Sequence, residues 1–178
     1  MAKEFSLIIS GFGGQGVLSA GKLVATAGLI EDKEVSWLPS YGPEMRGGTA
    51  NCSVIISDEL IGSPLLNDCN ALIALNLPSL EKFEPFVKNG GMIIIDSSLI
   101  HAKAKREDIE FLAIPASEIA SDMGNMTFAG IVLLGALSHK SGSFTRDSFE
   151  EALREVLPSK HHHLIPQEME AFDKGMAY

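Results

Sequence analysis

The chain has 178 residues, of which 46% are hydrophobic, and a net charge of −9 from 23 acidic and 14 basic residues. A domain of this length can bury its own core without disulfides or a structural metal, so we expect a single domain over residues 1–178. The excess of negative charge repels phosphate backbones, which argues against general binding to nucleic acids or anionic membranes.

Cys52 and Cys69 are the two cysteines of the chain. They are fewer than the four thiolates that hold an iron–sulfur cluster or a structural zinc ion. No apolar run approaches the roughly 20 residues of a membrane span, and no signal peptide is visible. We therefore predict two reduced thiols in a cytoplasmic protein.

The first part of the chain predicts strands that alternate with glycine-rich loops. A nearly continuous apolar run predicts a buried strand over 5–10, and a helix is predicted over about 15–30. In that helix Ser19, Lys22 and Thr26 form one polar stripe, so the rest of its surface is expected under the sheet or against another subunit. A strand over 34–38 should stop at Pro39, and a β-branched strand is predicted over 49–57.

The remaining segments continue the alternation. Strands are predicted over 71–75, 92–96 and 111–114, and helices over 78–87, 115–123, 127–139, 145–157 and 166–175. Gly130 and Gly135 should allow close helix packing. Alternating strands and helices imply parallel pairing with right-handed crossovers. The fold class is therefore α/β, a single Rossmann-like domain whose mostly parallel sheet is covered by helices on both faces.

The first loop, Gly11-Phe12-Gly13-Gly14-Gln15-Gly16, matches G-x-G-x-x-G between a strand and a helix. The first turn of a helix presents unpaired N–H groups that favour a phosphate or a carboxylate. A dinucleotide fold also needs an acidic residue at the end of the second strand, where this chain has Trp37-Leu38-Pro39-Ser40. We expect an anion or cofactor contact here rather than NAD; tight strand-to-helix packing alone is the alternative.

The second loop runs from Ser40 to Gly48 and should lie at the same carboxyl edge of the sheet. It combines an aromatic, a proline, two glycines in a row and Arg46, whose guanidinium can fork onto a carboxylate or a phosphate. A surface turn in which Arg46 pairs with Glu44 would explain the charge but not the rest of this composition.

These two loops closely resemble the paired signatures of the gamma family of 2-oxoacid:ferredoxin oxidoreductases, and the likeness extends through Ile114-Pro115-Ala116 and Gly124-Asn125. The resemblance implies a subunit that is not active alone. It supports CoA-dependent oxidative decarboxylation of a 2-oxoacid to an acyl-CoA, with electrons passed to ferredoxin. The short gamma chain looks most like that of the 2-oxoglutarate enzymes, while pyruvate and branched-chain enzymes use a similar domain.

The resemblance places the cofactors elsewhere. Thiamine diphosphate and Mg are expected between alpha and beta subunits, and iron–sulfur clusters on Cys-rich partners such as a ferredoxin-like delta subunit. CoA is a substrate that could contact this chain. The isolated chain could also self-associate as a homodimer.

The resemblance carries two loops and one further residue over as facing the active site or CoA, with Arg46 contacting substrate carboxylate or CoA phosphate. They are Gly11, Gly13, Gly14, Gln15, Gly16, Tyr41, Gly42, Pro43, Glu44, Met45, Arg46, Gly47, Gly48 and Asn125.

Other polar groups are interpreted as structural. His161-His162-His163 should form an exposed turn, and His101 and His139 should be solvated. Asp96-Ser97-Ser98 should end a strand and cap the next segment of the chain. Two other functions stay open: a free-standing Rossmann nucleotide-binding module, and a dimeric scaffold with degenerate loops.

Overall fold

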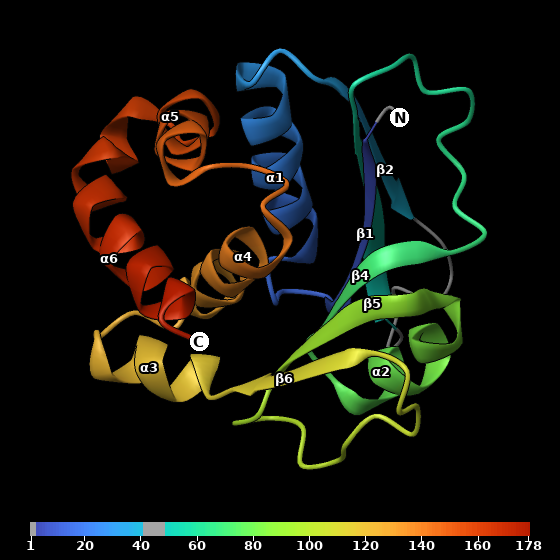
Figure 1. Cartoon of the computed structure of the whole chain (residues 1–178). Helices are drawn as coiled ribbons and strands as arrows, with labels where there is room; N and C mark the ends of the chain where they lie inside the picture. The colour runs from blue at the N-terminus through green and yellow to red at the C-terminus, as the bar shows by residue number, and fades with distance from the viewer. Residues whose placement is uncertain (1–2, 41–48) are drawn as a thin grey trace.

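The computed structural model describes residues 3–40 and 49–178, and in them one six-stranded sheet is flanked by helices (Figure 1). The strands are β1 (Glu4–Phe12), β2 (Glu34–Ser40), β3 (Thr49–Ser57), β4 (Cys69–Ala74), β5 (Val87–Asp96) and β6 (Glu110–Ile114). The α-helices are α1 (Val17–Ile30), α2 (Leu77–Phe83), α3 (Ala116–Asp122), α4 (Phe128–Ser141), α5 (Arg146–Val156) and α6 (Ile165–Met176). Two 3-10 helices are η2 (Glu84–Phe86) and η3 (Ser159–Leu164).

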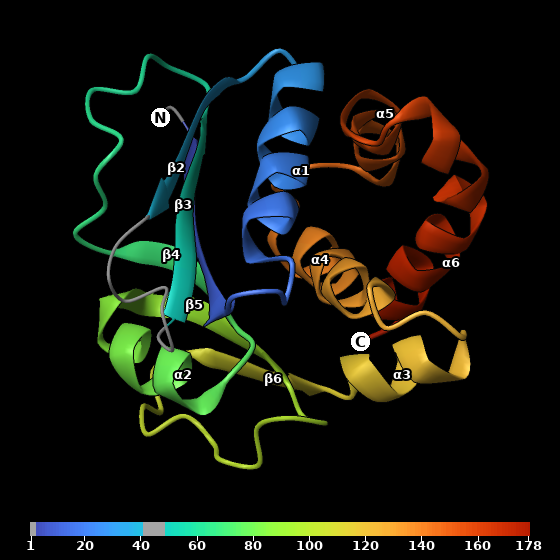
Figure 2. The ribbon, with the colours of Figure 1, turned by 180° about the vertical axis from the view of Figure 1, so that it is seen from behind.

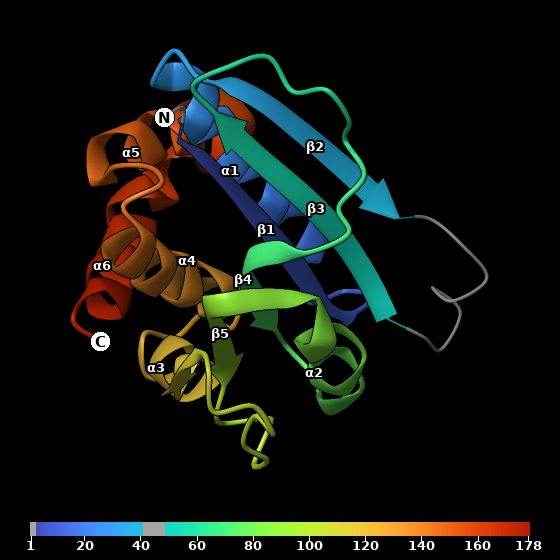
Figure 3. The same ribbon diagram turned by 45° about the vertical axis from the view of Figure 1, so that its right-hand side comes forward.

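The strand order is β2-β3-β1-β4-β5-β6. The pairs β1–β4, β4–β5 and β5–β6 are parallel, whereas β3 is antiparallel to both β1 and β2. Five of the six strands therefore run in one direction, and Figure 3 shows β3 pointing against its neighbours. The predicted α/β class with a mostly parallel sheet is confirmed, and β3 is the strand of this sheet that departs from parallel pairing.

Helices cover both faces, unequally. α1, α3, α4, α5 and α6 lie on one side of the sheet and α2 on the other, as Figures 1 and 2 show from opposite directions. The larger core joins strand residues such as Leu7 and Val54 to α1 and α4. The smaller core joins Ile8, Leu72 and Leu80 on the α2 side.

The α1 helix packs as the sequence predicts. Ser19 and Lys22 are exposed and Thr26 is half-buried, while Val24 and Ala27 are fully buried among the sheet and α5. The sheet and α5 of the same chain therefore cover most of α1, which fits the first of the two expected alternatives, while Leu29 stays 59% exposed.

The α4 and α6 helices cross at two glycines. A Cβ built on Gly135 would lie 2.0 Å from the carbonyl oxygen of Phe172, and one on Gly175 would lie 1.8 Å from that of Val132. Glycine is thus required at both positions for the backbones to approach so closely. The expectation for Gly130 is wrong, because nothing lies within 4 Å of a Cβ there.

Two smaller expectations also need correction. β2 continues through Pro39 to Ser40, which an edge strand tolerates because the missing N–H can face away from the sheet. The three histidines lie in η3, not in an open turn; His161 and His162 are half-buried, and a ring nitrogen of His162 lies 2.9 Å from the carbonyl oxygen of Leu157. His101 and His139 are exposed, as expected.

Candidate functional site

The first glycine loop and the strand ends that flank the second lie at one edge of the sheet. Ser10 on β1 pairs with Asn51, and Asn51 pairs in turn with Ser40 at the end of β2. The next pair along, Phe12 and Thr49, places the end of β1 beside the start of β3. Ser40 and Thr49, which flank the second loop in the sequence, therefore both lie at the edge that carries the first loop. The predicted residues of this loop, Tyr41, Gly42, Pro43, Glu44, Met45, Arg46, Gly47 and Gly48, themselves lie outside the described residues.

The glycines of the first loop differ in what their positions require of the backbone. Gly14 has φ 90° and Gly16 has φ 76°, both in the left-handed region that other residues rarely adopt. Gly16 is the N-cap of α1, and no side chain caps that helix. The first amide groups of α1 therefore point outward as donors for an anion. Gly13 meets no steric limit within 4 Å, so its presence has no packing explanation.

Gln15 closes this loop with its side chain. Its Oε1 accepts a hydrogen bond from the Phe12 amide at 2.6 Å, and its Nε2 donates to the carbonyl oxygen of Leu75 at 3.2 Å. A Cβ on Gly11 would lie 2.6 Å from Gln15 Oε1 and 2.8 Å from Leu75 Cβ. Gly11 is thus required by the position of the Gln15 carboxamide, and Gln15 is a positioning residue for the loop.

A crevice of about 330 Å³ opens beside the first loop. It lies where the chain leaves β1 through α1 on one face and leaves β4 through α2 on the other, which is the point where open α/β sheets bind ligands. Most of its walls are uncharged. Its lining residues are Gly14, Gln15, Gly16, Leu75, Asp96, Leu99, Ser117, Met126, Thr127, Ala129 and Gly130.

Asp96 forms the buried polar end of this crevice. Its carboxylate accepts hydrogen bonds from the Ser98 amide at 3.1 Å, from the Ser117 amide at 3.1 Å and from Ser117 Oγ at 2.5 Å. These bonds tie the end of β5 to the first turn of α3. Asp96 thus ends β5 and accepts from the next segment at Ser98, as expected; its contact with the first turn of α3, beyond β6, was not predicted.

Asn125 stabilises the segment before α4 that lines one side of the crevice. Its Oδ1 accepts from the Thr127 amide at 3.0 Å and from Thr127 Oγ1 at 2.7 Å, just before α4 begins. Thr127 and Met126 line the crevice, whereas Asn125 is absent from its lining. The structure therefore places Asn125 behind the rim, where it fixes the start of α4, a helix that no side chain caps.

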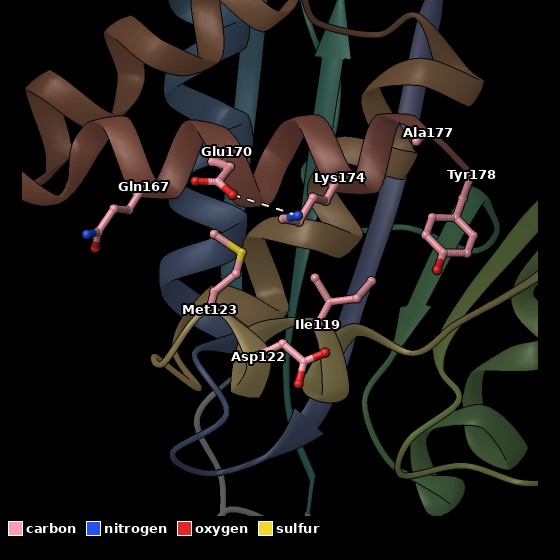
Figure 4. Close-up of a pocket in the computed structure, with 8 residues that line it drawn as sticks. All are labelled: Ile119, Asp122, Met123, Gln167, Glu170, Lys174, Ala177 and Tyr178. Atoms are coloured by element: carbon pink, nitrogen blue, oxygen red, sulfur yellow. Dashed lines mark ion pairs between the residues drawn. The ribbon is translucent and has the colours of Figure 1, made fainter.

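A larger hollow of about 500 Å³ lies between α3 and α6, and no residue of the first glycine loop lines it (Figure 4). Its walls carry Asp122 and an ion pair of Glu170 with Lys174 at 3.7 Å. It is bordered by the last residue, Tyr178. The residues that line this hollow include no strand end and no glycine loop at the start of a helix. We therefore assign the candidate site to the smaller crevice.

In the part of the chain that the structure describes, no reactive or metal-binding side chains gather at this edge. Burial raises the pKa of the Cys52 thiol and of the Cys69 thiol to about 12 each, so both stay protonated at neutral pH. Among the described residues no group of three His, Cys, Asp or Glu side chains is placed to hold a metal ion. Within the same residues no helix is long and apolar enough to cross a membrane.

The strand order also bears on NAD. In a dinucleotide-binding fold the second strand lies next to the first, so its terminal carboxylate reaches the ribose. Here β3 lies between β2 and β1. The end of β2 is therefore two strand spacings from β1, roughly 9–10 Å, instead of one. The missing carboxylate and this displacement both argue against binding of a nicotinamide dinucleotide.

Several crevice residues were not expected from the sequence. Leu75 and Leu99 lie in segments without a motif, whereas Met126 and Thr127 come directly after the Gly124-Asn125 pair that the resemblance quotes. All four residues lie at or near the predicted end of a strand or start of a helix, and this position does not separate lining residues from ordinary loop residues.

A doubly wound α/β domain with a glycine-loop crevice at its switch point is the class that the geometry defines. The pyruvate ferredoxin/flavodoxin oxidoreductase family matches residues 6–178. 2-oxoglutarate synthase subunit KorC of Methanocaldococcus jannaschii is 35% identical over 98% of this chain and 92% of its own. Ketoisovalerate oxidoreductase subunit VorA of Methanothermobacter marburgensis is 38% identical over 89% of this chain, which spans about 33% of that relative's length.

Solved structures agree. The gamma subunit of a keto/oxoacid ferredoxin oxidoreductase from Geobacter sulfurreducens superposes with a TM-score of 0.83 at 31% identity, covering 98% of this chain and 99% of its own. The 2-oxoglutarate:ferredoxin oxidoreductase of Magnetococcus marinus, solved with 2-oxoglutarate, coenzyme A and succinyl-CoA bound, gives a TM-score of 0.88 at 26% identity, over 98% of this chain and 31% of that one. The chain therefore belongs to the pyruvate ferredoxin/flavodoxin oxidoreductase family, and the Geobacter gamma subunit and KorC are relatives that it matches nearly end to end.

Proposed function

We propose that residues 1–178 act as a single gamma domain in a multisubunit, cytoplasmic 2-oxoacid:ferredoxin oxidoreductase that converts a 2-oxoacid and CoA to an acyl-CoA. The observation that carries this proposal is the near end-to-end match to gamma-type chains, which covers 92% of KorC and 99% of the Geobacter subunit. Alpha, beta and ferredoxin-like delta subunits are the proposed partners, with ferredoxin as electron acceptor.

We favour 2-oxoglutarate as the substrate. KorC subunits are relatives of similar length to this chain, whereas VorA relatives are about three times as long. Branched-chain 2-oxoacids compete because VorA is at least as similar in sequence, and pyruvate competes because the matching family is described by its pyruvate enzymes. The ratio of kcat/KM for the three acids in the purified complex decides between them.

The cofactors are assigned to partner subunits. Two buried cysteines with raised pKa values are too few and too protonated to hold a cluster. Thiamine diphosphate, Mg and iron–sulfur clusters would supply decarboxylation and electron transfer from those partners. The part of this chain is to bind and orient.

At the crevice, the open amides of α1 and the start of α4 would receive an anionic group of CoA or of the 2-oxoacid. The apolar walls would accept an adjoining uncharged part of the same ligand. Arg46, which the sequence places in the loop between β2 and β3 at this edge, would neutralise the anion.

Anaerobic purification of the chain from its native host tests the assignment. Recovery of a thiamine-binding pair and a ferredoxin-like subunit, with ferredoxin-linked 2-oxoacid activity, is the expected result. Recovery of the chain alone with a tightly bound nucleotide would overturn it in favour of the free-standing Rossmann module.

Arg46→Ala in the assembled enzyme tests the anion contact. We expect a KM for CoA or for the 2-oxoacid raised about tenfold, which is the loss of one charge-assisted contact. Arg154→Ala, on the exposed face of α5, is the matched control and should leave both constants unchanged. Unchanged KM values in Arg46→Ala would remove that role.

A further inference from the structure

The hollow between α3 and α6 combines opposite charges with apolar side chains. Asp122 borders it on the α3 side, and Lys174 borders it on the α6 side next to Glu170. Figure 4 shows Ile119 and Met123 pointing from α3 toward α6, and both are half-buried against the larger core. The hollow measures about 500 Å³, which lies within the range of roughly 300–1,000 Å³ that small-molecule sites occupy.

The charged groups of the hollow are only loosely engaged with one another. Lys174 Nζ lies 3.7 Å from Glu170 Oε1, longer than the about 2.7–2.9 Å of a charge-assisted hydrogen bond. These two side chains are 45% and 62% exposed, and ion pairs so exposed contribute little to stability. Among the residues that the structure describes, the Asp122 carboxylate has no ion pair and no hydrogen bond. A carboxylate on one helix and an ammonium on the other are therefore both open to a ligand.

This lining fits a small zwitterion with an aliphatic group. The carboxylate of such a ligand pairs with Lys174 and its ammonium pairs with Asp122. The ring of Tyr178, which also borders the hollow, offers an aromatic face that attracts a cation. The aliphatic group covers Ile119 and Met123, which favours binding in proportion to the apolar area removed from water. A ligand with one sign of charge leaves either the carboxylate or the ammonium of the hollow without a partner.

The α3 helix and the turn after it line both this hollow and the crevice. Ser117 in the first turn of α3 borders the crevice, whereas Asp122 at its end borders the hollow. These two residues are roughly 8 Å apart along the helix axis, at a rise of about 1.5 Å per residue. Met123 borders the hollow, and Met126, three positions later, borders the crevice. Because a short helix moves as a rigid element, a displacement of α3 at the hollow also moves the crevice wall.

We infer that the hollow binds a free α-amino acid with an aliphatic side chain, and that this binding is coupled to the crevice through α3. The coupling rests on the proposed function, which places CoA or the 2-oxoacid in the crevice, whereas the site itself does not rest on it. An α-amino acid and a 2-oxoacid with the same side chain differ in one functional group, an amine against an oxo group. The site therefore lets an enzyme of 2-oxoacids respond to the corresponding amino acids.

Isothermal titration calorimetry of the full chain with L-leucine tests the site. Two analogues keep the side chain and remove one charge each: L-leucinamide lacks the carboxylate, and 4-methylpentanoate lacks the ammonium. We expect saturable binding of leucine and at least about tenfold weaker binding of either analogue, the loss of one charge-assisted contact. Equal binding of leucine and both analogues, or no saturable binding of leucine up to about 10 mM, would overturn the inference.

Substitutions separate the two charged contacts. Asp122→Asn and Lys174→Gln should each weaken leucine binding about tenfold. Asp122→Asn should leave the affinity for 4-methylpentanoate unchanged, because that analogue has no ammonium to lose a partner. Glu155→Gln and Lys160→Gln remove the same charges at exposed positions outside the hollow, and both should bind leucine like the unsubstituted chain. Thermal melting shows whether each variant keeps its fold; controls that lose as much affinity as the hollow variants would overturn the site.

The coupling is measured in the purified complex. Saturating CoA or 2-oxoglutarate, each added alone, is compared for its effect on the leucine dissociation constant. At least one of the two should change that constant about fivefold or more, as is common for coupled sites. A constant that neither ligand changes would overturn the coupling. A complex without CoA-dependent 2-oxoacid activity would remove the proposed function and the coupling with it, whereas leucine binding by the chain alone decides the site independently.

Discussion

Gln15 on the first glycine loop donates a hydrogen bond from its carboxamide to the carbonyl oxygen of Leu75 at the end of β4. The same carboxamide accepts from the Phe12 amide, so one side chain links the loop after β1 to the neighbouring strand. The shape of the crevice wall at Gly14 and Gly16 therefore depends on Gln15, because its carboxamide both accepts and donates a hydrogen bond.

Gln15→Glu should destabilise the chain by about 1–2 kcal/mol, because a carboxylate cannot donate to the Leu75 oxygen and leaves that acceptor unpaired. Urea unfolding at pH 7 measures the change. Gln167→Glu, on the exposed face of α6, is the control and should shift stability by less than about 0.5 kcal/mol. Equal effects at the two positions would show that Gln15 has no special role in the loop.

Asp96 makes a second prediction, at the other end of the crevice. Its carboxylate accepts from the Ser117 amide and hydroxyl, and Asp96→Asn turns an NH2 group toward one of these donors. We expect a loss of about 1–3 kcal/mol in unfolding free energy, since a buried donor is left without an acceptor. Asp122→Asn, exposed at the end of α3, should change stability little. A nearly neutral Asp96→Asn would show that the α3 cap is dispensable.

The crossing of α4 and α6 gives a third prediction from three glycines. Gly135→Ala and Gly175→Ala each force a methyl group against a backbone oxygen of the other helix and should cost about 1–3 kcal/mol or more. Gly130→Ala on α4 has open space around its Cβ and should instead stabilise by about 0.5–1 kcal/mol, because alanine loses less backbone entropy in a helix. Thermal or denaturant unfolding of the three variants checks both signs, and a stabilising Gly135→Ala would contradict the close crossing.

Much of the fold was predictable because the local signals agreed with it. The apolar runs at β1 and β3 and the amphipathic pattern of α5 predicted those elements to within about two residues. The first half of β5 was missed, since Lys88, Asn89, Gly90 and Gly91 are poor strand formers. Tertiary contacts hold this segment in the strand. The Gly90 amide donates to the backbone carbonyl oxygen of Asp108, and the Arg106 guanidinium donates to that of Val87.

The antiparallel direction of β3 could have been predicted from the length of the connection that precedes it. A parallel crossover needs a dozen or more residues, and the connection from Ser40 to Thr49 is shorter than that. Length alone therefore predicts an antiparallel pair. The crevice was predictable at Gly14, Gln15 and Gly16, where special backbone conformations leave a glycine signature. It was not predictable at Leu99 or Met126, whose role depends on strand order.

Glu168 on α6 gives a prediction about pH. Its side chain is 8% exposed, and burial raises its pKa above the ordinary value of 4.5. Below pH 4.5 the carboxyl is protonated in both the folded and the unfolded chain, so its contribution to stability is fully present there. As the pH rises through the folded-state pKa, the folded chain carries a buried charge that the unfolded chain carries in water, and that contribution is lost.

Glu168→Gln keeps the size of the side chain and removes this titration. The variant should therefore gain stability relative to the unsubstituted chain between pH 4 and pH 7, and urea unfolding at both values measures the gain. Glu170→Gln, one exposed carboxylate further along the same helix, controls for the loss of one negative charge. A stability difference between Glu168→Gln and the unsubstituted chain that is the same at both pH values, or that shrinks toward neutral pH, would mean that water reaches the Glu168 carboxylate in the folded chain.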